Sequence, residues 1–149
     1  MMTTVRQMLS AKPDVYAVKP EDTVYDALEL MAARNIGAVL VVSGSDASGS
    51  EVKGILSERD YARRVVLHGK MSKDTLVGEI MTTDVICVEP SWTADQCMAL
   101  MTEKHIRHLP VLDKGRLVGV ISIGDVVRAV LDEQQFTITS LERYILTGG

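Results

Sequence analysis

The sequence predicts an α+β fold made of two tandem copies of a β-α-β-β-α unit. The prediction rests on an internal repeat, on a β-branched hairpin in each copy, and on helical apolar spacing on both sides of each hairpin. A shift of 70 positions superposes identical residues, among them Val18 on Val88 and Thr23 on Thr93. A shift of 65 continues the match beyond the hairpins. The pairs that it aligns include Gly54 with Gly119, Ser57 with Ser122, Asp60 with Asp125, and Arg63 with Arg128.

These alignments divide the chain into residues 5–68 as repeat one, 69–76 as a linker, 77–132 as repeat two, and 133–149 as a tail. The shift falls from 70 to 65 because the first copy has a longer polar loop, residues 43–50, where the second has residues 113–116. Short leaders, residues 5–9 and 77–81, could form a helical turn before each copy. In the tail, residues 139–146 could form a short amphipathic helix that packs on the body or on a partner chain.

Each copy begins with a strand, residues 15–18 or 85–88, which ends before a proline that has no amide hydrogen to donate. The helix that follows is expected to start at Thr23 or Thr93, with Asp26 or Gln96 completing a capping box. Apolar strand pairs come next, at 38–42 with 52–56 and at 109–112 with 117–121. The last helices are expected at residues 57–66 and 122–131.

Composition excludes several classes of protein. The formal net charge of −4 provides no broad positive field for nucleic acid, and no apolar run reaches the roughly 18 residues of a membrane span. Cys87 and Cys97 lack the spacing of a zinc site or a redox motif and are interpreted as small core residues. We therefore expect a soluble protein of the reducing cytoplasm.

The most informative motif is Gly-apolar-apolar-Ser-x-x-Asp, which occurs at residues 54–60 and again at 119–125. It lies where a strand passes into a helix, so the Ser and Asp could bind a ligand rich in hydroxyl groups, the Asp accepting hydrogen bonds as it would from a ribose diol. The same two residues also form an ordinary N-cap pair. The glycine of the motif favours the ligand-binding interpretation. A helix cap does not require a glycine at this position, whereas the close approach of a ligand to the backbone does.

Basic residues form a second group near these motifs. They are Arg59, Arg63 and Arg64 in the first copy, and Lys104, His105, Arg107 and His108 in the second. They could hold phosphates, although a solvated helix face explains any single one of them. The two histidines have no carboxylate or cysteine at ligand spacing, so no metal site is expected. No catalytic motif is present, and no enzyme activity is expected.

Taken together, these motifs resemble a pair of cystathionine-β-synthase (CBS) domains. The resemblance spans about residues 5 to 132 and rests on Val-x-Pro-x-x-Thr before a helix and on the Gly-apolar-apolar-Ser-x-x-Asp motif after a hairpin, both present twice. The stretch His-Ile-Arg-His-Leu-Pro-Val at 105–111 is also similar to the second copy of that family. The resemblance implies two repeats about a pseudo-twofold axis, two clefts for adenine nucleotides, a homodimer, and regulation of a separate protein.

The resemblance also implies roles for individual residues. Ribose-binding residues would be Ser57 and Asp60 in one cleft, and Ser122 and Asp125 in the other. Adenine-lining residues would be Tyr16, Ala17, Ile86 and Cys87. Phosphate-binding residues would be Arg59, Arg63, Arg107 and His108. No catalytic cofactor is implied.

The two clefts are expected to differ, because the first copy has Gly37-Ala38 where the second has Arg107-His108. The expected function is a sensor for AMP, ADP, ATP, NAD or a similar adenosine ligand. Two alternatives remain open: a small nucleotide-processing enzyme that uses the same clefts, and a structural dimerisation module whose clefts are empty.

Overall fold

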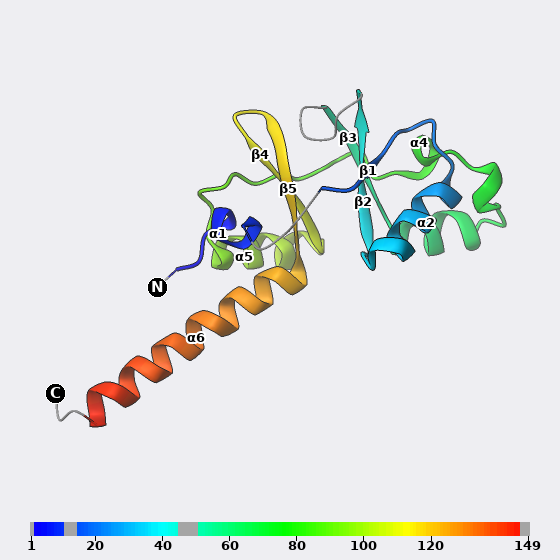
Figure 1. The fold of residues 1–149 in the computed structure, drawn as a ribbon. Coiled ribbons are helices and arrows are strands. Elements are labelled where there is room, and N and C mark those ends of the chain that lie inside the picture. The colour runs from blue at the N-terminus through cyan, green and yellow to red at the C-terminus, as the bar shows by residue number, and fades with distance from the viewer. Residues whose placement is uncertain (1, 11–14, 45–50, 147–149) are drawn as a thin grey trace. The chain divides into compact units, whose positions relative to one another are not determined.

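A computed structural model describes residues 2–10, 15–44 and 51–146 of the chain (Figure 1). Residues 45–50 of the expected long loop and residues 147–149 of the tail lie outside the described residues. The structure divides into two compact units. One comprises Met1–Pro13, Val88–Val111 and Val120–Gly149, and the other comprises Asp14–Cys87 and Leu112–Gly119.

The first repeat forms a three-stranded sheet in the order β1-β2-β3. Its elements are β1 (Ala17–Val18), α2 (Val24–Arg34), β2 (Ala38–Ser43), β3 (Glu51–Ser57) and α3 (Glu58–Tyr61), followed by the π-helical segment η1 (Ala62–Val66). The pair β1 and β2 is parallel, with Ala17 opposite Leu40, and β2 and β3 are antiparallel, with Ala38 opposite Ser57. The expected α+β architecture is thus present in this copy.

The second repeat has a two-stranded sheet of β4 (His108–Asp113) and β5 (Arg116–Ser122), preceded by α5 (Ala94–Lys104). The strand expected at 85–88 is reduced to one parallel bridge between Val88 and Val111. A local turn explains the difference, because the amide of Val85 donates to the carbonyl of Thr83 at 2.9 Å and is not used in a ladder.

Both expected capping boxes are confirmed. Thr23 Oγ1 accepts from the amide of Asp26 at 3.1 Å, and Thr93 Oγ1 accepts from the amide of Gln96 at 3.2 Å. The two helices also end alike, since Asn35 and His105 each have a left-handed backbone with φ of 54°. The repeat is therefore reproduced at both ends of α2 and α5.

The two leaders form short helices. The leader of each sequence repeat lies in the compact unit that contains the long helix of the other repeat. The helix α1 (Val5–Leu9) lies in the unit of α5, where the amide of Val5 donates to Trp92 O at 2.7 Å. After the 3-10 turn η2 (Ser72–Asp74), the helix α4 (Val77–Ile80) lies in the unit of α2, where the amide of Val77 donates to Asp22 O at 2.8 Å. Each compact unit thus combines residues of both sequence repeats.

The last helix, α6, runs without interruption from Ile123 to Leu146. The sequence predicts two separate helices here, at 122–131 and 139–146. The intervening residues contain no proline or glycine, so the backbone continues as a helix although most of these side chains are exposed.

Candidate functional site

The first strand-to-helix junction is a complete capping box. The strand β3 ends at Ser57, and α3 begins at the next residue. The amide of Ser57 donates to Asp60 Oδ2 at 2.9 Å, and the Ser57 hydroxyl lies 3.1 Å from the same oxygen. In return, Ser57 Oγ accepts from the amide of Asp60 at 3.1 Å. The carboxylate is therefore held in one orientation at the mouth of the helix.

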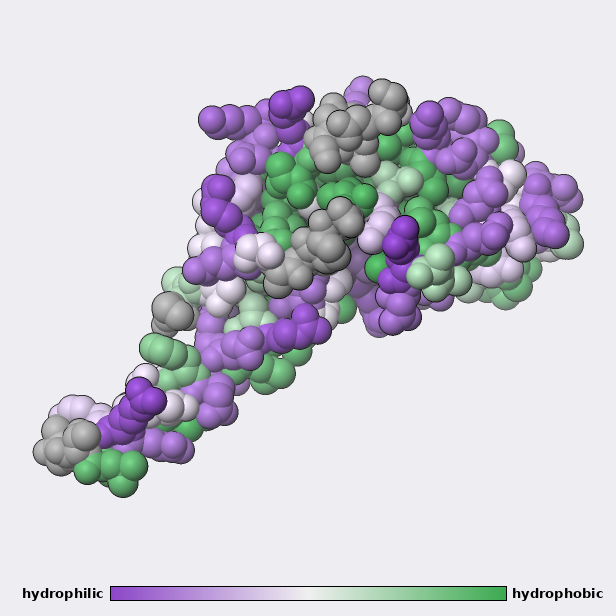
Figure 2. All heavy atoms as spheres, in the orientation of Figure 1, coloured by the Kyte–Doolittle hydropathy of each residue, from purple (hydrophilic) through white to green (hydrophobic). Residues whose placement is uncertain are grey.

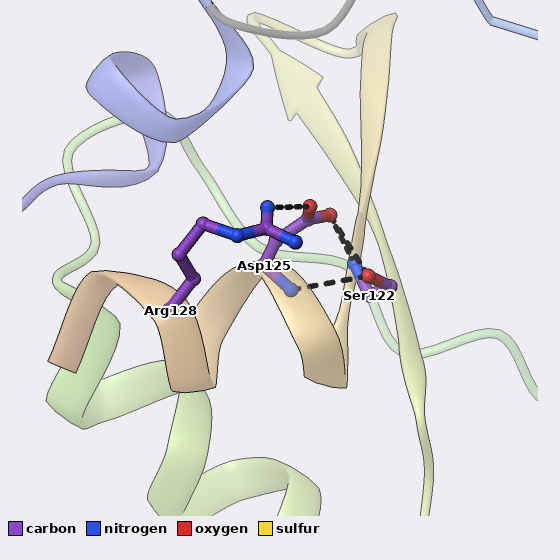
Figure 3. Close-up of polar contacts among 3 residues, drawn as sticks. All are labelled: Ser122, Asp125 and Arg128. Atoms are coloured by element: carbon purple, nitrogen blue, oxygen red, sulfur yellow. Dashed lines mark hydrogen bonds and ion pairs between the residues drawn. The ribbon is translucent and has the colours of Figure 1, made fainter. Parts of the chain in front are cut away.

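The second junction repeats this arrangement (Figure 3). The amide of Ser122 donates to Asp125 Oδ2 at 2.8 Å, the Ser122 hydroxyl lies 3.0 Å from that oxygen, and the amide of Asp125 donates to Ser122 Oγ at 3.2 Å. The alternative that each Ser-Asp pair caps a helix is thus observed in both repeats. Capping and ligand binding are compatible, because the cap uses Oδ2 and a carboxylate has two acceptor oxygens.

The other carboxylate oxygen, Oδ1, differs between the junctions. In the first, Asp60 Oδ1 accepts from the Thr82 hydroxyl at 3.4 Å. In the second, Asp125 Oδ1 lies 3.7 Å from a guanidinium nitrogen of Arg128, which comes from the next turn of α6. The sequence carried a signal for Arg128, which stands three residues after Asp125 and aligns with Arg63. It carried none for Thr82, which is 22 positions away.

Gly54 has a structural explanation. A Cβ placed there would lie 2.7 Å from Thr82 O and 2.9 Å from Met81 Sδ. The close approach comes from the chain itself, since the amides of Ile55 and Thr82 each donate to the other residue's carbonyl. The neighbouring backbone is therefore enough to require a glycine at position 54, so this residue by itself does not indicate a ligand.

Of the expected adenine-lining residues of the first copy, Ala17 lies in the sheet that contains Ser57, and Tyr16 directly precedes β1. Ala17 pairs with β2, and β2 separates it from β3, a distance of roughly 10 Å across the sheet. Tyr16 is half-buried, and the guanidinium carbon of Arg34 lies 5.0 Å from the centre of its ring. No motif in the sequence indicated Arg34, which occupies one approach to this ring.

The corresponding residues of the second copy, Ile86 and Cys87, are half-buried and lie outside any strand. They belong to the unit of the first repeat, whereas Ser122 and Asp125 belong to the other unit. The expected adenine- and ribose-binding residues of the first copy thus lie in one unit, whereas those of the second copy are divided between the two units. Burial raises the pKa of the Cys87 thiol.

The expected phosphate-binding side chains are accessible to different degrees. Arg59 on α3, Arg63 in η1 and Arg107 before β4 are exposed, whereas His108 is half-buried at the start of β4. The guanidinium of the neighbouring Arg64 donates a hydrogen bond to the carbonyl oxygen of Ile80 at 2.8 Å. Arg59 and Arg63 thus lie in the same unit as Ser57 and Asp60.

Comparison with known proteins identifies the repeats. The model of the CBS domain family matches residues 5–67 and 77–132. A mitochondrial CBS domain-containing protein of Arabidopsis thaliana, CBSX3, is 42% identical over 130 residues, which are 86% of this chain and 62% of that protein. The CBS domain-containing protein YhcV of Bacillus subtilis is 32% identical over 124 residues, 83% of each chain.

Solved structures agree with these matches. A protein with CBS domains from Burkholderia ambifaria is 56% identical, with a TM-score of 0.82 over 91% of this chain and 99% of that one. A CBS domain protein from Pyrobaculum aerophilum, complexed with AMP, has the same fold at 22% identity, with a TM-score of 0.71 over 82% of this chain and 88% of that one. Within the part of the chain that the structure describes, no helix has the length and apolarity that a membrane crossing needs.

Proposed function

This chain belongs to the CBS-domain family, and from that premise we propose that it is a regulatory module that binds an adenine nucleotide and thereby alters its engagement of another protein. The ligand would be AMP, ADP, ATP, NAD or a similar adenosine compound. The proposal contains no chemical step, and a change in the relative stability of two states of the module is sufficient for regulation.

The single observation that carries the proposal is the fixed carboxylate of Asp60. The cap uses Oδ2 and holds the side chain in place. The contact of Oδ1 with Thr82 is 3.4 Å, long for a hydroxyl donor, so this oxygen keeps acceptor capacity for a better-placed hydroxyl. A ribose diol offers two such donors, and a carboxylate oriented in advance binds them without losing rotamer entropy.

Other residues of the same unit would complete this first site. We assign the adenine to the region of Tyr16 and Ala17, on the sheet that ends at Ser57. The exposed guanidinium groups of Arg59 and Arg63 would neutralise the phosphates, for which planar bidentate donors are well suited.

The second motif would form a weaker site for hydroxyl groups. Arg128 lies beside Asp125 Oδ1, and its positive charge offsets part of the carboxylate's charge. Within this unit we assign Ser122 and Asp125 to the ribose, and Arg107 and His108 to the phosphates. The different basic residues of the two sites favour different phosphate groups.

The comparisons support the proposal at the level of the family and the fold. The Pyrobaculum protein shows that a protein of this fold holds AMP. Because this chain spans 62% of the Arabidopsis relative, the activity and partners of a whole protein remain part of the proposal. We also propose a homodimer and a cytoplasmic location, although the Arabidopsis relative is described as mitochondrial.

Titration calorimetry of the full chain with AMP, ADP, ATP and NAD tests the proposal. The decisive variant is Asp60→Asn, with Asp26→Asn as its matched control, because both residues are the third helical residue of a capping box. We expect at least one ligand to bind, Asp60→Asn to weaken binding tenfold or more, and Asp26→Asn to leave it within twofold. Equal affinity for both variants contradicts the ribose assignment.

One observation favours a second candidate, a structural module that binds no nucleotide. Both Ser-Asp pairs are complete caps, and the backbone near Thr82 already explains Gly54. This candidate predicts no heat of binding with any of the four ligands. It also predicts that Asp60→Asn and Asp26→Asn lower the free energy of unfolding by similar amounts, about 1 kcal/mol each.

A further inference from the structure

The distal segment of α6, residues 131–146, exposes an apolar stripe. The exposed fractions are 58% for Leu131, 49% for Ile138, 58% for Leu141 and 74% for Ile145. Green hydrophobic residues are visible among hydrophilic ones along this part of the helix (Figure 2). The family match ends at residue 132, so this segment lies almost entirely outside the CBS repeats. Isolated exposed apolar residues are common, but a continuous stripe on one helix needs an explanation.

The exposed residues follow a seven-residue spacing. Positions 131, 138 and 145 are seven apart, and positions 134 and 141 fall between them, which is the a and d pattern of a coiled coil. We call these five residues the seam: Leu131, Gln134, Ile138, Leu141 and Ile145. The face that packs on the helix's own unit is a different one, since Val126 and Ala129 are its buried residues. The seam is therefore not the helix's own core contact.

The charges of the segment lie outside the seam. They are Asp132, Glu133, Glu142 and Arg143. Glu133 also accepts a hydrogen bond from the amide of Thr3, which ties it to its own chain. If two such helices pair in parallel, the flanking e and g positions bring Thr137 against Glu142 and no like charges together. The net charge of the segment is negative, which disfavours docking on an anionic membrane surface.

We propose that the seam docks on the seam of a second copy of this chain as a parallel two-stranded pair. Isoleucine at two a positions and leucine at a d position are the residue types that favour two parallel strands. Gln134 would face Gln134 of the second copy, where two amides can satisfy each other's hydrogen bonds and set the register. The seam side chains, with Val127 and Tyr144 beside them, would bury on the order of 1,000 Å², near the lower bound of a specific interface.

Disulfide trapping tests the register directly. Gln134→Cys in the full chain is expected to give mostly crosslinked dimer under mild oxidation, because the pairing places position 134 opposite itself. Ser140→Cys is the matched control, since it is exposed on the same helix and lies off the seam. The unsubstituted chain, which keeps Cys87 and Cys97, gives the background. Equal crosslinking of the two variants, or none above background, overturns the proposal.

Sedimentation velocity over a range of concentrations gives a second, independent measurement. Ile138→Glu is expected to weaken self-association at least tenfold. Phe136→Glu should leave it within twofold, although Phe136 is 54% exposed and only two residues away. Far-UV circular dichroism checks that both variants remain helical. The same association constant for both variants contradicts the seam. Vesicle binding gives a second contradicting outcome: the unsubstituted chain binds phosphatidylcholine or phosphatidylserine vesicles, and Ile138→Glu abolishes that binding but leaves self-association unchanged.

Discussion

The two strand-to-helix junctions have the same motif and the same capping hydrogen bonds, but their carboxylates have different further neighbours. Asp60 meets the neutral hydroxyl of Thr82, and Asp125 meets the cation of Arg128. The motif reproduces the local geometry wherever it occurs, because its bonds join residues three apart. The surroundings are set by other segments and have diverged. A duplicated motif therefore does not make two equivalent sites.

The helices that follow the junctions differ even more. In the first repeat, α3 passes after four residues into the π-helical segment η1, which ends at Val66. In the second, α6 continues for 24 residues. Arg64 in the first aligns with Ala129 in the second. Arg64 reaches the carbonyl of Ile80, whereas Ala129 is buried on α6. The same position thus serves a polar contact in one repeat and apolar packing in the other.

The largest expected effect is that of Gly54→Ala, which tests the close approach found in the first repeat. Its Cβ would lie 2.7 Å from the carbonyl oxygen of Thr82, so either β3 or the segment that carries Thr82 must shift. We expect the free energy of unfolding to fall by about 2–3 kcal/mol, measured by urea denaturation. Gly37→Ala is the control, since its Cβ would lie 3.6 Å from Glu58 Oε1, an ordinary contact. An equal loss in both variants would show that the close approach is not the cause.

Arg64→Met tests the polar contact that the second repeat lacks. It keeps much of the apolar stem but removes the charged donor to Ile80 O, a bond of 2.8 Å. We expect a loss of about 1–2 kcal/mol in the free energy of unfolding, by the same denaturation. Arg63→Met, at an exposed neighbour, should change stability by less than about 0.5 kcal/mol. A stable Arg64→Met variant would mean that the carbonyl finds another donor.

A pH-dependent difference is expected at Cys97, which aligns with Ala27 of the first repeat; both are fully buried. Burial raises the pKa of the Cys97 thiol to about 11 from 9.0. The unfolded chain therefore ionises first, and stability falls as the pH rises through 9. Between pH 8 and pH 10, the unsubstituted chain should lose about 1 kcal/mol more than Cys97→Ala. Identical pH profiles from thermal or urea unfolding would contradict this assignment.

The smallest effect on stability is expected for Arg128→Gln. The side chain of Arg128 is 73% exposed, so its 3.7 Å ion pair with Asp125 is screened by water. We expect a change of less than about 0.5 kcal/mol, and less still at high salt. A loss above 1 kcal/mol at low salt would show that Arg128 is needed to hold Asp125. Calorimetry of the same variant then measures how far Arg128 separates the ligand preferences of the two sites.

The amino-acid sequence alone determined the features whose interactions are local. The hairpins and the caps at Thr23 and Thr93 depend on residues close together in the chain, and so do the Ser-Asp caps, whose bonds join residues three apart. The repeat is visible as aligned identities in the sequence. Residue type and spacing are enough to predict such bonds, because the intervening backbone can adopt only a few conformations. The family resemblance rests on these same local motifs and is confirmed by the family match.

Tertiary structure decided whatever depends on segments that are distant in the chain. The pairing of α1 with the unit of α5, the approach of Thr82 to both Gly54 and Asp60, and the bond from Arg64 to Ile80 have no local signal. The strand expected at 85–88 is replaced by a turn at Thr83, and α6 joins the two helices expected at 122–131 and 139–146 into one. Burial patterns predict where a helix packs, whereas hydrogen bonding and the absence of breakers decide how far it extends.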